Sequence, residues 1–258
     1  MSDKVIGIGG GVGPEAGIEL QKQIIQNTNA GGTDQGHIDV YHISKASDIV
    51  DRTEFLLNNA KENPAEGMYR TAQTLHSAAS IADKELVMGI PCNTFHTPKI
   101  FNRFLELLEL NGLNITVVNM LQETGEFIKT SYPNITKVGL MSTTGTRTVN
   151  TYKKVLEPLG FNIIEVPESM QPELHDSIYN KEWGIKAVNR NSSKARDNFL
   201  RFAENLQKQG VDIIILGCSE IPLVLSEKHF NGIPLIDPVL VLARALIREV
   251  AKEKLRPI

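Results

Sequence analysis

The sequence predicts an α/β protein built from two pseudo-symmetric Rossmann-like lobes, each with a mainly parallel sheet flanked by helices. Short runs rich in Val and Ile alternate along the chain with longer amphipathic stretches, which is typical of buried parallel strands connected by helices. The chain also repeats itself coarsely: KVIGIGGGVGPEAG near the start resembles KVGLMSTTGTRTVN at 137–150, and ELVMGIPCNT at 85–94 resembles DIIILGCSEI at 212–221. We expect the active site in the cleft between the lobes, because ligands of open α/β sheets bind at the carboxyl ends of strands.

Each expected element follows from its local pattern. Strands are short apolar runs, predicted at 4–8, 38–43, 85–90, 115–118, 137–141, 162–166 and 212–216. Helices are predicted at 14–27, 65–82, 119–130, 148–159, 192–209 and 239–254, and Pro14 suits the first position of the first helix. The stretch NGIPLIDPVLVLARALIREV adds a short strand and a long helix that we expect to pack on the first lobe. The predicted lobes are therefore residues 1–118 plus 227–258 and residues 119–226.

Composition excludes several classes of protein. The 258 residues have a formal net charge of −3 and no run of basic residues, so binding to nucleic acid is not expected. The N-terminus lacks the pattern of a signal peptide, and no apolar stretch approaches the length of about 18 residues that a membrane span needs, so we expect a cytoplasmic protein. The 2 cysteines are expected to be free thiols, and they do not have the spacing of a metal site.

The glycine-rich turn at 9–13 raises the alternative of a dinucleotide site, but its spacing does not fit. A G-x-G-x-x-G pattern that starts at Gly7 requires glycine in place of Val12, and one that starts at Gly9 requires glycine in place of Pro14. The chain also lacks the GK[ST] triplet of a phosphate-binding loop. We therefore expect no nucleotide cofactor.

Cys92 and Cys218 are each expected at the carboxyl end of a strand, followed by small polar residues. A single cysteine at such a position usually belongs to the core. Two thiols on opposite sides of a carbon atom suit inversion of configuration, because a thiolate removes a proton from one face and a thiol returns a proton to the other. A free thiol has a pKa of about 8.5, and backbone N–H groups after each cysteine would favour the thiolate and hold a carboxylate.

Six short motifs along the chain resemble those of one enzyme family. They are GGGVGPEA at 9–16, DRT at 51–53, PCNTFH at 91–96, STTGT at 142–146, GCSEIPL at 217–223 and PLIDP at 234–238. Together they resemble the aspartate/glutamate racemase superfamily, and most closely its aspartate racemase branch. The resemblance implies a homodimeric isomerase that interconverts L- and D-aspartate, with glutamate as the alternative acidic substrate, and that needs no pyridoxal phosphate or other cofactor.

The resemblance also implies roles for the residues of the two cysteine motifs. Cys92 and Cys218 are the expected acid/base pair. Asn93, Thr94 and Ser219 are expected to bind the α-carboxylate of the substrate, and Ser219 keeps the hydroxyl of the threonine that is usual in the family.

Further substrate contacts are implied outside these motifs. Thr143 is expected nearby in the second lobe, and Val12 is expected at the glycine-rich turn, where it replaces the methionine of the aspartate branch. Arg52 is expected to pair with the side-chain carboxylate of the substrate, a task that suits the forked donors of arginine. Glu220 stands where glutamate racemases carry histidine, which favours the aspartate branch, and it could hold the substrate ammonium group.

Several assignments stay open at the level of sequence. The segment IYNKEWGIKA at 178–187 departs from the family pattern, and both Lys181 and Lys186 are candidates for a lysine that reaches the substrate carboxylate. His96 could tune the thiol of Cys92 or have a structural role. Asp51 is expected to cap a helix or to orient Arg52.

The overall function also has alternatives. The same scaffold could serve a racemase for a different amino acid, or a related isomerase or decarboxylase. It could also serve an amino-acid-binding protein that has lost turnover, although retention of both cysteines argues against that alternative.

Overall fold

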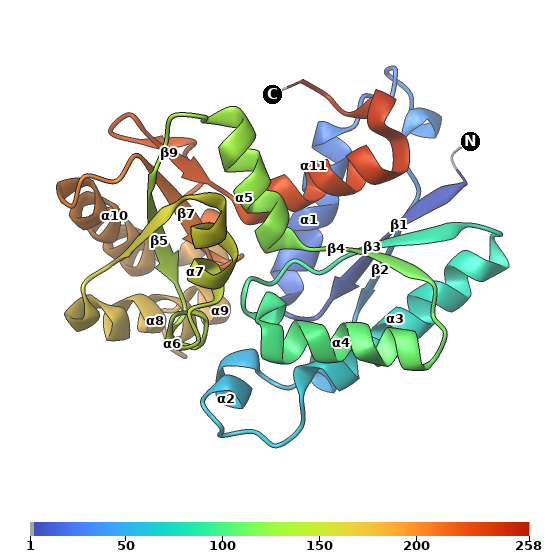
Figure 1. Ribbon diagram of the computed structural model, residues 1–258, viewed down its shortest axis with the longest axis horizontal. Coiled ribbons are helices and arrows are strands. Elements are labelled where there is room, and N and C mark those ends of the chain that lie inside the picture. Colours follow the sequence, from blue (N-terminus) through green and yellow to red (C-terminus); the bar gives the residue numbers. More distant parts are fainter. Residues whose placement is uncertain (1–2, 258) are drawn as a thin grey trace. The chain divides into compact units, whose positions relative to one another are not determined.

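The computed structural model describes residues 3–257, which form two compact units (Figure 1). The first unit contains the chain up to Glu123 and again from Val239, and the second unit contains Thr124–Pro238. The chain enters the second unit within helix α5 (Met120–Ser131) and leaves it at the start of helix α11 (Pro238–Ala251). Each unit has its own mainly parallel sheet flanked by helices, so the predicted fold class is confirmed.

The first unit is built on a parallel sheet with the strand order β2-β1-β3-β4. Its strands are β1 (Lys4–Gly10), β2 (Val40–Ser44), β3 (Glu85–Gly89) and β4 (Ile115–Val118). Helices α1 (Pro14–Asn27) and α11 lie along one face of the sheet, and helices α3 (Pro64–Ile81) and α4 (Pro98–Leu110) lie along the other (Figure 1). The short helix α2 (Arg52–Leu56) belongs to the connection between β2 and α3.

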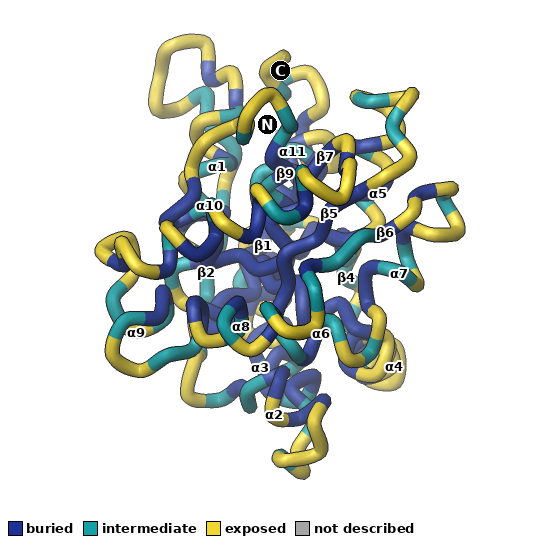
Figure 2. Tube along the Cα trace, turned by 90° about the vertical axis from the view of Figure 1, so that its left-hand side faces the viewer, coloured by how far each residue is buried: buried dark blue, intermediate teal, exposed yellow. Residues whose placement is uncertain are grey.

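The core of the first unit forms where apolar strand residues meet these helices. Val5, Ile6 and Ile8 of β1 have no exposed surface, and this strand is dark blue in Figure 2. On β3, a Cβ atom added to Gly89 would lie 2.7 Å from a methyl carbon of Leu246 on α11, so a glycine lets this helix approach the sheet. The close packing fixes the carboxyl ends of the strands, which carry the candidate site.

The second unit repeats this plan with the strand order β6-β5-β7-β9-β8. Its strands are β5 (Lys137–Ser142), β6 (Asn162–Glu165), β7 (Ile213–Gly217), β8 (His229–Phe230) and β9 (Ile233–Ile236), and they pair in parallel except for β8 with β9. Its helices are α6 (Thr144–Thr148), α7 (Thr151–Leu156), α8 (Gln171–Tyr179), α9 (Ile185–Val188) and α10 (Ser193–Lys208). Phe199, Phe202 and Leu206 of α10 are central to its buried core.

Single turns of 3-10 helix connect several of these elements. They are η1 (Asp34–Gly36), η2 (Ala46–Asp48), η3 (Thr94–His96), η4 (Glu157–Leu159), η5 (Glu168–Met170), η6 (Asn189–Asn191), η7 (Ile221–Leu223) and η8 (Lys252–Lys254). Between residues 3 and 257, no helix has both the length and the apolar character that crossing a bilayer requires.

The observed units differ from the predicted lobes in where the chain returns. The sequence prediction assigned 227–258 to the first lobe, whereas β9 pairs in parallel with β7 through Ile214 with Leu235 and Ile215 with Ile236. The strand therefore belongs to the second sheet, because it supplies hydrogen bonds to the edge of β7 that β5 does not use. The predicted helix at 148–159 is also interrupted, because Asn150 adopts a left-handed backbone conformation with φ of 54°.

Candidate active site

Cys92 lies in a tight turn that follows β3 in the first unit. Its backbone N–H donates to the carbonyl of Ile90 at 2.9 Å, and its own carbonyl accepts from the N–H of Phe95 at 3.2 Å. The side chain is 6% exposed, and the neighbouring Asn93 and Thr94 are also buried. The turn therefore places a thiol and two polar side chains together at the carboxyl end of β3.

His96 holds this turn through the backbone of Cys92. Its Nδ1 atom lies 2.9 Å from the carbonyl oxygen of Cys92, and its ring stacks on Phe101 with 4.9 Å between the ring centroids. Burial lowers the pKa of His96 to about 4, although hydrogen bonds with the backbone of Cys92 and Val118 oppose the shift. The imidazole is therefore neutral near pH 7 and donates to the carbonyl, which favours the structural role over tuning of the thiol by a positive charge.

Arg52 begins helix α2, in the connection that follows β2. Asp51 caps this helix, because its carboxylate accepts from the N–H groups of Thr53 at 2.8 Å and Glu54 at 3.0 Å. Asp51 therefore acts as the helix cap that the sequence suggested. The cap fixes the start of the helix, and it leaves Arg52 buried with 6% of its surface exposed.

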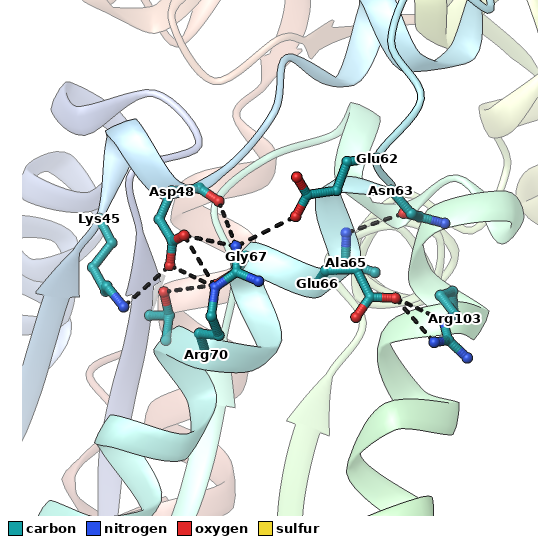
Figure 3. Close-up of polar contacts among 10 residues, drawn as sticks. Lys45, Asp48, Glu62, Asn63, Ala65, Glu66, Gly67, Arg70 and Arg103 are labelled. Carbon is teal, nitrogen blue, oxygen red and sulfur yellow. Dashed lines mark hydrogen bonds and ion pairs between the residues drawn. The ribbon is translucent and has the colours of Figure 1, made fainter.

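The segment before Arg52 is anchored to helix α3 by an arginine (Figure 3). The Nε atom of Arg70 donates to Asp48 Oδ2 at 2.9 Å, and one of its terminal nitrogens donates to the Asp48 carbonyl at 3.2 Å. The hydrogen bonds from Arg70 to the Asp48 carboxylate, together with Lys45, whose Nζ lies 3.1 Å from Oδ2, lower the pKa of Asp48 to about 2, although burial opposes the shift. Gly67 permits the close approach, because a Cβ atom there would lie 2.0 Å from the Asp48 carbonyl oxygen.

Val12 lies in the glycine-rich turn that follows β1. Gly11 and Gly13 on either side have φ angles of 88° and 107°, values that glycine adopts readily and other residues rarely do. Val12 itself is 1% exposed. Since β1, β2 and β3 are parallel, the segments carrying Val12, Arg52 and Cys92 all follow the same edge of one sheet.

Cys218 directly follows β7 in the second unit, at the position that corresponds to Cys92. Its sulfur donates a hydrogen bond to Glu220 Oε2 at 2.9 Å, and the hydroxyl of Ser219 lies 3.2 Å from the same oxygen. The other oxygen of Glu220 accepts from Lys186 Nζ at 2.9 Å. The structure therefore brings together four residues that the sequence singled out: Cys218, Ser219, Glu220 and Lys186.

The electrostatic surroundings of Cys218 favour its protonated form. Burial raises the pKa of the Cys218 thiol well above its usual range, and the negative charge of Glu220 raises it further. Lys186 acts in the opposite direction. Cys218 is therefore a thiol near neutral pH.

The two candidate lysines have different surroundings in the second unit. Lys186 lies on α9, pairs with Glu220, and has its Nζ atom 5.0 Å from the ring centroid of Tyr179. The ring of His175 stacks on the ring of Tyr179, with 4.5 Å between the ring centroids. Lys181 is exposed. Sequence analysis did not single out Tyr179, and only the fold shows that its ring supports Lys186.

Thr143 follows β5 and caps the short helix α6. Its hydroxyl oxygen accepts from the N–H of Thr146 at 3.4 Å, and the two hydroxyls lie 3.1 Å apart. Gln171 of α8 braces the strand end by donating to the carbonyl of Ser142 at 3.0 Å. Gln171 is a further residue that sequence analysis missed, because no local pattern shows that α8 meets the end of β5.

Across residues 3–257, no group of three or more His, Cys, Asp and Glu side chains is arranged to hold a metal ion.

Comparison with known proteins agrees with the motifs. A family model described as Asp/Glu/Hydantoin racemase matches residues 10–246. The structure is similar to that of Picrophilus torridus aspartate racemase, with a TM-score of 0.77 and 29% sequence identity over 97% of both chains.

Two more distant structures share the fold. An aspartate racemase homologue from Pyrococcus horikoshii OT3 has a TM-score of 0.68 and 22% identity, with 95% of this chain and 98% of that chain covered. Glutamate racemase from Francisella tularensis, in complex with D-glutamate, has a TM-score of 0.60 and 15% identity, with 100% of this chain and 84% of that chain covered. The resemblance noted from the motifs is confirmed, and the chain belongs to the Asp/Glu/hydantoin racemase family and is an isomerase of the amino-acid racemase class.

Proposed function

We propose that the protein interconverts L- and D-aspartate without pyridoxal phosphate, using Cys92 and Cys218 as an acid/base pair. One observation carries the proposal. Each unit has a buried cysteine at the carboxyl end of an equivalent strand, β3 in the first unit and β7 in the second. Core packing alone gives no reason for the same residue type at both strand ends.

The proposed chemistry is a two-base proton exchange at the α-carbon. A thiolate accepts the α-proton, so that the C–H bond breaks and an S–H bond forms, and the other thiol donates its proton to the opposite face of the carbanion. Asn93, Thr94 and Ser219 would hold the α-carboxylate during this exchange. The chemistry requires that both sulfurs reach one α-carbon.

Three observations support an acidic substrate. Arg52 is buried and brings a guanidinium, whose forked donors suit a carboxylate, to the edge of the first sheet that carries Cys92. Lys186 adds a second positive charge next to the Cys218 motif. The chain is also 29% identical in sequence to an aspartate racemase of similar structure. Aspartate is therefore the first substrate to test, and glutamate is the second.

The test is isotope exchange in D2O with purified protein and no added pyridoxal phosphate. We expect L-aspartate to yield D-aspartate carrying deuterium at the α-carbon, as measured by chiral chromatography and mass spectrometry. The variant that carries both Cys92→Ser and Cys218→Ser is the control, and it should show no exchange. If neither enantiomer of aspartate or glutamate exchanges its α-proton, the acidic substrate is wrong, and a screen of the other amino acids identifies the correct one.

Two further measurements test the remaining parts of the proposal. Activity that appears only with added pyridoxal phosphate would contradict the cofactor-independent mechanism. The resemblance to aspartate racemases also supports a homodimer, and sedimentation equilibrium would measure the mass of the assembly.

A further inference from the structure

The carboxylate of Glu220 is enclosed by polar partners that include the sulfur of a candidate catalytic cysteine. One oxygen accepts from the Cys218 thiol at 2.9 Å and lies 3.2 Å from the Ser219 hydroxyl. The other oxygen accepts from Lys186 at 2.9 Å. Glu220 is 5% exposed and Cys218 is 6% exposed, so water screens these contacts weakly. The arrangement links an ammonium group, a carboxylate and a thiol in one row.

The order of charges in this row determines which form of the thiol is favoured. A reactive cysteine usually has a positive group next to its sulfur, because a positive charge stabilises the thiolate. Here a negative group is next to the sulfur, and a carboxylate that accepts the S–H hydrogen bond stabilises the protonated thiol. Lys186 binds the other oxygen of Glu220, and its positive charge acts on the Cys218 thiol in the opposite direction.

Aromatic contacts hold Lys186 next to the carboxylate of Glu220. The ring of Tyr179 lies 5.0 Å from Lys186 Nζ, and the stacked ring of His175 supports it. These contacts hold the ammonium group beside Glu220.

We propose that Glu220 is a positioning residue that holds Cys218 in its thiol form in the unliganded protein, and that Lys186 weakens this effect by partly neutralising the carboxylate. For the racemase of the preceding subsection, on which this consequence rests, Cys218 is then the proton donor of the first turnover. The two cysteines are equivalent in the fold, and a carboxylate accepts a hydrogen bond from the sulfur of Cys218.

The test measures thiol ionisation directly and needs no substrate. Every protein carries Cys92→Ser, so that Cys218 is the one remaining cysteine, and thiolate absorbance at 240 nm is followed against pH. The variant with both cysteines replaced is the blank that removes the tyrosine signal. We expect Glu220→Gln to lower the midpoint of Cys218 ionisation by about one pH unit or more, which is a tenfold rise in thiolate at a fixed pH. Lys186→Met should raise the midpoint.

The opposite signs of these two shifts separate the proposal from a merely structural role. Glu227→Gln is the matched control, because Glu227 pairs with Arg196 in the same unit and is exposed, and it should leave the midpoint unchanged. If Glu220→Gln does not fold, as judged by circular dichroism, Glu220→Asp replaces it, since the shorter side chain draws the carboxylate away from the sulfur and should also lower the midpoint.

The outcomes distinguish this proposal from the proposed function. A midpoint that is unchanged or raised in the Glu220 variants overturns the assignment of Glu220, even if the wild-type protein racemises aspartate. A lowered midpoint supports the assignment even if aspartate proves to be the wrong substrate, because the titration contains no amino acid.

Discussion

Cys92 and Cys218 occupy equivalent strand ends, but their immediate contacts differ. At Cys92, a neutral imidazole from His96 binds the backbone carbonyl. At Cys218, the carboxylate of Glu220 accepts a hydrogen bond from the sulfur itself. Two equivalent strand ends thus place their thiols in different surroundings.

Replacing either cysteine with serine should separate catalysis from folding. Cys92→Ser and Cys218→Ser change one buried atom each, so we expect thermal unfolding close to that of the wild type. Racemisation should fall by about 10²-fold or more, because a serine hydroxyl is a far weaker acid than a thiol and does not ionise near neutral pH to serve as the base. Chiral chromatography measures the rate, and calorimetry measures the stability. Variants that lose stability but keep the wild-type rate would show that the thiols are structural.

His96 should make the protein sensitive to acid. The unfolded chain protonates this histidine near its usual pKa of about 6.5, whereas burial keeps the folded pKa at about 4. Between these values the unfolded state binds more protons, so stability is fully present above about pH 6.5 and is lost as the pH falls toward 4. The slope is about 1.4 kcal/mol per pH unit, or up to about 3 kcal/mol in total.

Urea denaturation at a series of pH values tests this prediction. His96→Gln should lower the unfolding free energy at pH 7, because it removes the stacking on Phe101, but it should flatten the pH dependence between 6.5 and 4. The exposed His229, replaced with glutamine, controls for the loss of a histidine and should keep the wild-type slope. An unchanged slope in His96→Gln would show that another group causes the acid sensitivity.

At the scale of elements, helix α3 both covers the first sheet and holds the segment that leads to Arg52. Gly67 lies where the helix meets the backbone of Asp48, and Arg70, one turn further along, binds the Asp48 carboxylate and carbonyl. The helix and the loop are thus joined by the close approach at Gly67 and by the hydrogen bonds of Arg70. We expect that a change at Gly67 weakens both of these contacts with Asp48.

Gly67→Ala should destabilise the protein although alanine is the better helix former. Alanine gains about 1 kcal/mol in a helix interior. Its Cβ atom would, however, lie 2.0 Å from the Asp48 carbonyl oxygen, and displacing backbone in a packed region costs about 1–3 kcal/mol. Denaturant unfolding measures the balance. Ser77→Ala, at an exposed position of the same helix, is the control and should be neutral or slightly stabilising. A stabilised Gly67→Ala protein would contradict the close approach.

Elements with strong local patterns could be predicted from sequence, and elements set by tertiary contacts could not. The strand at 115–118 has the predicted bounds, because its apolar run ends at polar residues on both sides. Helix α4 was not predicted, although its buried residues follow helical spacing at Ile100, Phe104, Leu107 and Leu108. Helix α8 offers a weaker pattern, and its position depends on packing against α10.

The candidate site shows the same limit. The two cysteine motifs are visible in the sequence, because strand, cysteine and polar turn are adjacent. Lys186 and Glu220 are 34 positions apart, and nothing local distinguishes Lys186 from Lys181. The contact between Lys186 and Glu220 depends on the turn between α8 and α9, which is a property of the folded unit.

At the scale of the whole molecule, the internal repeat of the sequence corresponds to two sheets with matching strand orders. The strands before the glycine-rich and threonine-rich turns correspond, as do the strands before each cysteine. The boundaries of the units were harder to predict than their number. They depend on the sheet to which the short strand β9 adds its hydrogen bonds, and an apolar run of this length carries no information about its partner.

The return of the chain to its first unit has a consequence for biosynthesis. Helix α11 closes one face of the first sheet, where Leu246 meets Gly89, and Arg244 of this helix donates to Asn27 on α1 at 2.9 Å. A ribosome makes the whole second unit before it makes this helix, an interval of roughly ten seconds at ordinary rates of translation. At the end of that interval the second unit has all of its strands and helices, whereas the part of the first sheet that α11 covers is still exposed. The unit whose synthesis begins first is therefore the last to receive all of its helices.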